Sequence, residues 1–114
     1  MPAPIEFSER ELTPSKAIAE NAAKGLELRE KFGRGGTDVG KRRATQLSAR
    51  EPIDMADMKS MYSYFARHDV DRRARRWGDD ENPSPGWVAW LLWGGDEARE
   101  WVGRLRAKYH REDR

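Results

Sequence analysis

Apolar side chains recur at intervals of three and four residues along most of this chain, the spacing that places them on one side of an α-helix. The pattern predicts a first helix from Thr13 to Gly33. Thr13 is expected to cap its start, with Pro14 in the first turn, and Gly33 is expected to end it. The predicted stripe of this helix comprises Ile18, Ala22, Leu26, Arg29 and Phe32.

Two shorter helices follow. Thr37 is expected to cap a helix that ends near residues 48–50, with one side formed by Val39, Arg43, Ala44 and Leu47. Asp54 is expected to cap the next helix, and Asp57 in its first turn is expected to interact favourably with the positive N-terminal end. The segment 69–71 is expected to break this helix. The buried stripe of this third helix is predicted to be Met55, Met58, Met61, Tyr62 and Phe65.

The last third of the chain predicts two more helices. Ser84 and Pro85 repeat the arrangement of a cap followed by proline, residues 87–93 are apolar throughout, and Gly94 and Gly95 follow them. Asp96 is expected to cap a final helix, whose stripe comprises Ala98, Trp101, Val102, Leu105 and Tyr109. A strand over 87–93 is the competing interpretation, but no partner strand is visible in the sequence.

The expected fold class is therefore all-α, a compact single domain of about five short helices. The predicted organisation is an extended, flexible N-terminal arm over residues 1–12, a helical domain over 13–110, and a disordered tail over 111–114. A length of 114 residues agrees with one domain.

Composition supports a folded chain. Charged residues make up 37% of it, which alone would favour disorder, but five Trp, three Tyr and three Phe need burial. The absence of cysteine excludes disulfides and thiolate zinc sites and fits a reducing compartment. No apolar run approaches the roughly 20 residues of a membrane span, and the first residues do not resemble a signal peptide. A soluble, intracellular protein is expected.

Basic charge is clustered. The formal net charge is only +2, but residues 29–50 carry seven basic and two acidic side chains, and residues 67–76 carry five basic and two acidic ones. An acidic run follows at residues 79–81. Clustered basic charge indicates a polyanionic partner more strongly than the small net charge does.

The segment from Gly35 to Lys41 satisfies the first seven positions of the phosphate-binding loop pattern G-x-x-x-x-G-K-[ST], but Arg42 occupies the eighth. Arginine cannot hold magnesium, and the preceding segment is predicted to be helical instead of a strand. Nucleotide hydrolysis is therefore not expected. Two interpretations stay open: a helix stop followed by a glycine turn, or a helix start that binds a backbone phosphate of DNA or RNA.

On the second interpretation, phosphate contacts are predicted around the start of the second helix and in a later basic segment. The first set comprises Arg34, Gly35, Gly36, Thr37, Lys41, Arg42 and Arg43, and the second comprises Arg72, Arg73, Arg75, Arg76 and Trp77. Ordinary solvated surface charge is the alternative for the second set. Trp77 is expected to be exposed for base stacking, whereas core packing is expected for Trp87, Trp90, Trp93 and Trp101.

The sequence offers no catalytic constellation. His68 and His110 are far apart and lack companions for a metal site, and no nucleophile has a neighbouring base. A non-enzyme is expected, without catalytic residues, metal, cofactor or small-molecule substrate.

Several strings resemble a small module encoded by tailed bacteriophages and prophages, which occurs alone or joined to head-maturation proteases and other phage proteins. The resemblance covers about residues 20–102 and is carried by residues 24–37, Val39-Gly40, Arg43-Ala44, Leu47, residues 61–71, residues 83–86 and residues 89–96. It implies phage origin and lends no catalytic residues. Asp38 and the doubled Arg72-Arg73 depart from the expected pattern, so a role of the later basic segment is not implied for the whole family.

The leading hypothesis is a phage-encoded helical module that binds nucleic acid, DNA before RNA, through backbone phosphates with low sequence specificity. The alternatives are a virion or head-assembly protein that acts through protein contacts, and an inhibitor of a host protein. The expected location is the cytoplasm of the infected bacterial host or the virion, with no membrane partner.

Overall fold

The computed structural model describes the backbone of residues 7–112, and within that range all regular structure is helical, which confirms the all-α prediction. Five of these helices have eight or more residues. A four-residue helix precedes them, and a 3-10 helix follows the third of them. In chain order the elements are α1 (Glu9–Leu12), α2 (Lys16–Phe32), α3 (Asp38–Ser48), α4 (Met55–His68), η1 (Asp69–Arg73), α5 (Pro85–Leu92) and α6 (Gly95–Glu112).

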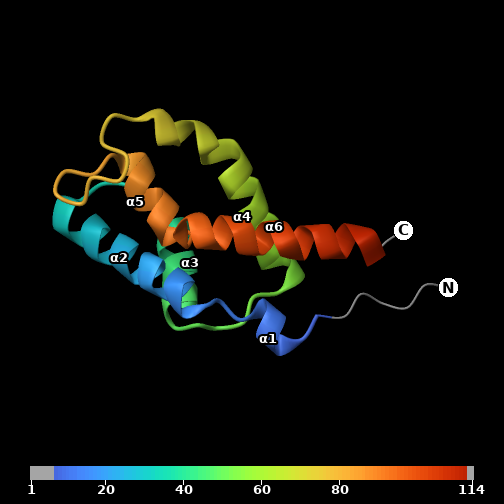
Figure 1. Ribbon diagram of the computed structural model, residues 1–114. Coiled ribbons are helices and arrows are strands. Elements are labelled where there is room, and N and C mark those ends of the chain that lie inside the picture. Colours follow the sequence, from blue (N-terminus) through green and yellow to red (C-terminus); the bar gives the residue numbers. More distant parts are fainter. Residues whose placement is uncertain (1–6, 113–114) are drawn as a thin grey trace.

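The short apolar helix α5 is central to the packing. Figure 1 shows α5 beside α2 at one end of the molecule, while the long helix α6 extends away from α5 and crosses α4; α2 also packs against α3. Trp90 on α5 is fully buried and contacts the rings of Tyr64 and Phe65 on α4. The core therefore forms around the tryptophan-rich segment, as its uninterrupted apolar sequence predicts.

Most predicted helix ends are confirmed. The side chains of Thr37, Asp54 and Ser84 each accept a hydrogen bond from the backbone N–H three residues later. Asp57 completes a capping box with Asp54. Gly33 ends α2 in the left-handed region, at a φ of 63°, as a C-terminal glycine should.

Two predicted caps are wrong. Ser15 caps α2, because the hydroxyl of Thr13 donates to the Glu9 carbonyl and closes α1 instead. At the other end of the chain α6 begins at Gly95, and the Asp96 carboxylate accepts a hydrogen bond of 2.9 Å from Nε1 of buried Trp90. A buried indole N–H needs an acceptor, and this requirement takes precedence over the cap.

The predicted N-terminal arm falls partly outside the described residues, which exclude 1–6 and 113–114. Its remaining part is helical: Ser8 and Glu11 form a capping box around α1. The backbone N–H of Ile53 donates to the Leu12 carbonyl, which holds this turn against the body. At the other end α6 continues to Glu112, into the predicted tail.

A glycine lets α2 and α5 approach each other closely. A Cβ atom at Gly25 would lie only 2.7 Å from the backbone nitrogen of Leu92, closer than real Cβ contacts. Gly103 on α6 is also inside a helix, but nothing lies within 4 Å of the position where its Cβ would stand. The two positions therefore separate the effect of helix propensity from that of packing.

We expect Gly25→Ala to lower the free energy of unfolding by about 1 to 3 kcal/mol, because the added methyl group forces α2 and α5 apart. Gly103→Ala should raise it by about 0.5 to 1 kcal/mol, because alanine restricts the unfolded chain more than glycine. Urea denaturation of both variants measures the difference. Equal effects of the two substitutions would show that α2 and α5 do not pack as described.

Candidate nucleic-acid interface

The glycine-rich loop after α2 is shaped by packing against α5. Gly35 and Gly36 have φ angles of 90° and 74°, in the left-handed region. A Cβ atom would lie 2.6 Å from Cβ of Val88 at Gly35, and 2.5 Å from Cδ1 of Leu92 at Gly36. Packing against α5 therefore explains why glycine occupies both positions. The loop also follows a helix, whereas a nucleotide-hydrolysing loop follows a strand.

The start of α3 is open to solvent but carries its own negative charge. Thr37 is exposed, and its hydroxyl accepts from Gly40 N at 3.3 Å. The side chain of Asp38 in the first turn is 87% exposed, with Arg29 Nη2 at 3.7 Å from its carboxylate. A carboxylate at a helix N-terminus interacts favourably with the dipole and competes with a phosphate for the same place.

A small hollow of about 240 Å³ borders this loop. It is lined by Arg29, Gly33, Arg34, Gly35 and Gly36. Nε of Arg29 donates to the Gly35 carbonyl at 3.2 Å, which holds one guanidinium at the wall. Sequence reasoning placed Arg29 on the apolar stripe of the helix and missed its position beside the loop.

Arg43 is a structural residue, and its prediction as a phosphate contact is corrected. Its Nη1 lies 2.7 Å from Asp57 Oδ1 and 2.6 Å from Gln46 Oε1, and its side chain is only 12% exposed. The guanidinium also lies over the Trp93 ring, 5.5 Å from the centroid. The neighbouring side chains of Lys41 and Arg42 are exposed.

The pKa of Asp57 is lowered by this contact. Partial burial opposes ionisation of the carboxyl group, but the hydrogen bonds from Arg43, from the Asp54 backbone and from Gln46 together outweigh it. Arg43 therefore holds α3 to the start of α4 through an ionised partner.

The second basic segment is exposed, as predicted for Arg72, Arg73, Arg75 and Arg76. Trp77 does not provide an exposed stacking platform. Its ring is half-buried and packs edge-on against Trp87 and Trp90, at centroid distances of 5.1 and 5.2 Å. Trp77 therefore packs with the tryptophans of α5 at the edge of the core.

The structure also forms a basic groove between α4 and α6 that sequence reasoning missed. Two hollows of about 370 and 270 Å³ adjoin at Tyr62. The first is lined by Met58, Lys59, Tyr62, Ser63, Arg106 and His110, and the second by Tyr62, Phe65, Ala66, Arg99, Val102 and Gly103. Among the described residues, no Asp or Glu lines either hollow. We call the two hollows together the α4–α6 groove.

One carboxylate joins the α4–α6 groove to the second basic segment. Asp69 Oδ1 lies 3.2 Å from Arg99 Nη2 and 3.7 Å from Arg72 Nη1. Both guanidinium groups lie over the Trp90 ring, at 5.7 and 5.8 Å from its centroid. Arg99 of the groove and Arg72 of the second basic segment therefore share one carboxylate.

The segment 79–84 lies between the glycine-rich loop and the second basic segment in its contacts. Asp80 in this segment pairs with Lys24 on α2 and accepts a hydrogen bond from Trp87 Nε1 at 3.1 Å. Nη1 of Arg34 lies 3.4 Å from Asn82 Oδ1, and the Ser84 N–H donates to the Arg76 carbonyl. Both basic segments of the sequence thus contact residues 79–84, Arg34 through Asn82 and Arg76 through Ser84.

The sequence contained a signal for the groove. Arg99, Arg106 and His110 recur at seven- and four-residue spacing on α6, and Lys59 and Ser63 are four residues apart on α4. Only the pairing of α4 with α6 brings the two stripes together.

Within the part of the chain that the structure describes, no group of three or more His, Cys, Asp or Glu side chains could hold a metal ion. No helix in that range is long and apolar enough to cross a bilayer. In comparisons with known proteins, no family model matches the chain, and no curated protein or solved structure is significantly similar to it. The resemblance to a phage module therefore stays a prediction.

We expect Arg43→Gln to lower the free energy of unfolding by about 1 to 2 kcal/mol at neutral pH, since a charged hydrogen bond is lost at a partly screened site. Because the pKa of Asp57 is lowered in the folded state, this stabilisation is present above its unfolded pKa of about 4 and disappears as the pH falls below it. Urea denaturation at several pH values measures the effect. Arg42→Gln, one residue away and exposed, is the control and should be nearly neutral; equal loss in both variants would contradict the assignment.

Proposed function

We propose that this chain is a phage-type helical module, without catalytic activity, that binds nucleic acid through backbone phosphates in the bacterial host or the virion. The observation that carries the proposal is the α4–α6 groove, which has basic side chains along its length and no carboxylate among the described residues that line it. A groove of one sign of charge raises the local concentration of a polyanion.

The spacing of the cations supports a polymeric partner. Arg99 and Arg106 are seven residues apart on α6, about 10 Å along the helix axis, which equals the rise of about three phosphates along the axis of a duplex. Arg72 extends the row past Arg99 through their shared Asp69. Arg73, Arg75 and Arg76 follow Arg72 in the sequence as exposed side chains.

The chemistry of the groove favours low sequence specificity. Its lining contains no Asn or Gln, the side chains that read adenine edges in pairs of hydrogen bonds. The guanidinium of Arg106 lies over the Tyr62 ring, 4.3 Å from its centre, and this cation–π contact holds the guanidinium in place. Contacts to phosphates position a nucleic acid without reading its sequence.

The cations near the glycine-rich loop are secondary contacts in this proposal. Arg34, Lys41 and Arg42 are exposed, but Asp38 stands among them at the start of α3.

A role in virion assembly or in blocking a host protein is the second candidate. The observation that favours it is a cleft beside α6, in which charged side chains surround the largely buried Ile18, Trp101 and Leu105. Protein interfaces also place charged and polar side chains around a buried apolar centre.

We expect saturable binding of a fluorescent DNA duplex that weakens steeply with salt. If Lys59, Arg72, Arg99 and Arg106 each neutralise one phosphate, affinity should fall by about 100-fold between roughly 50 and 200 mM salt. A titration at several salt concentrations measures the slope. Absence of binding at the low-salt end would falsify the proposed function.

Variants locate the contact. Arg99→Gln with Arg106→Gln should weaken binding by about tenfold or more, whereas Lys41→Gln with Arg42→Gln removes the same charge and should cost much less. Arg99→Lys with Arg106→Lys keeps the charge and should restore most of the affinity. The reverse order of effects would move the site to the glycine-rich loop.

A further inference from the structure

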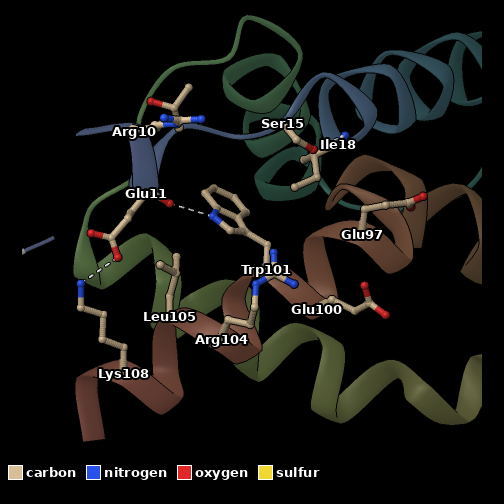
Figure 2. A pocket seen from close by; sticks show the side chains of 11 residues that line it. Arg10, Glu11, Ser15, Ile18, Glu97, Glu100, Trp101, Arg104, Leu105 and Lys108 are labelled. Atoms are coloured by element: carbon tan, nitrogen blue, oxygen red, sulfur yellow. Dashed lines mark hydrogen bonds and ion pairs between the residues drawn. The ribbon is translucent and has the colours of Figure 1, made fainter. Parts of the chain in front are cut away.

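A cleft of about 650 Å³ separates α6 from a strap formed by α1 and the residues up to the start of α2. Figure 2 shows the Trp101 ring inside this cleft, between Glu11 on the strap and the rest of α6. Nε1 of Trp101 donates to the Glu11 carbonyl, and Lys108 Nζ contacts the Glu11 carboxylate, both at 2.8 Å. The strap is therefore fixed at one end of the cleft, and the remaining wall is open.

The charges along the cleft side of α6 are ordered. Glu97 and Glu100 come first, and Arg104 and Lys108 follow, all lining the cleft (Figure 2). Glu97 is already bonded to Asn21 at 2.7 Å and Lys108 to Glu11. Glu100 and Arg104 are exposed, and among the described residues neither forms an ion pair, although their spacing would allow them to pair with each other.

This order of charges is self-complementary. The midpoint between Glu100 and Arg104 is Val102, and the midpoint between Glu97 and Lys108 falls between Val102 and Gly103. A twofold axis at that level would therefore bring both acidic residues of one helix opposite both basic residues of an antiparallel copy. A surface that matches itself in this way is what a twofold interface requires.

We propose that this face of α6 pairs antiparallel with α6 of a second copy of this chain, each helix lying along the cleft of the other. The Glu100 carboxylate of each copy meets the Arg104 guanidinium of the other. The inference does not rest on the proposed function. The α4–α6 groove uses Arg99, Gly103 and Arg106, on the opposite side of α6, and stays open in the pair.

Charge exchange between the two positions tests the pairing. The wild-type chain should dimerise in sedimentation velocity as its concentration rises. Glu100→Arg and Arg104→Glu, each alone, create two like-charge contacts across the twofold axis and should weaken dimerisation by about tenfold or more. An equimolar mixture of these two variants should form a heterodimer, since each contact again joins opposite charges. The double variant Glu100→Arg/Arg104→Glu should dimerise like the wild type for the same reason.

The remaining outcomes overturn the proposal. A wild-type chain that stays monomeric at every concentration would show that the cleft receives a different partner or none. A dimer that neither single substitution weakens would place the interface on another face. Circular dichroism and thermal denaturation establish that the variants fold; Glu100→Gln and Arg104→Gln are the milder replacements, and the proposal requires both of them to weaken the dimer. Failure of DNA binding leaves this test unchanged, because the experiment contains no nucleic acid.

Discussion

The burial of α5 is the constraint on which the rest of the structure depends. This helix carries no charged side chain, so every side of it must be covered by protein. Glycines make that coverage possible: Gly25 on α2 and Gly35 and Gly36 in the following loop bring backbone directly against α5. The opposite side meets the aromatic rings of α4, where Phe65 packs edge-on against Trp90. The positions of α2, α3 and α4 follow from how each covers this one helix.

Local chemistry made much of the fold predictable. The five longer helices, the caps at Thr37, Asp54 and Ser84, and the stop at Gly33 all depend on residues within a few positions of each other. The predictions failed where a distant group decided the outcome. Asp96 was expected to cap α6, but its carboxylate serves the buried indole of Trp90. Thr13 was expected to start a helix, but it ends α1.

The candidate site was harder to predict, because charge in a sequence does not reveal its partners. Arg43 and Arg42 are neighbours of the same chemical type, yet Asp57, from the next helix, takes Arg43 out of solvent. Trp77 lies beside two arginines in sequence but packs against two other tryptophans. The α4–α6 groove exists only because two helices pair, and its residues come from stripes that look like ordinary solvated faces when each is considered alone.

Asp69 holds Arg72 and Arg99 at the same carboxylate, close to where the groove meets the second basic segment. On the proposed function, the Asp69 carboxylate competes with phosphate for Arg72 and Arg99. A phosphate that binds these two guanidinium groups must displace the carboxylate, which then becomes hydrated. Part of the electrostatic gain is thereby offset at this end of the groove. On the proposed function, binding at this end of the groove is therefore weaker than the number of guanidinium groups alone suggests.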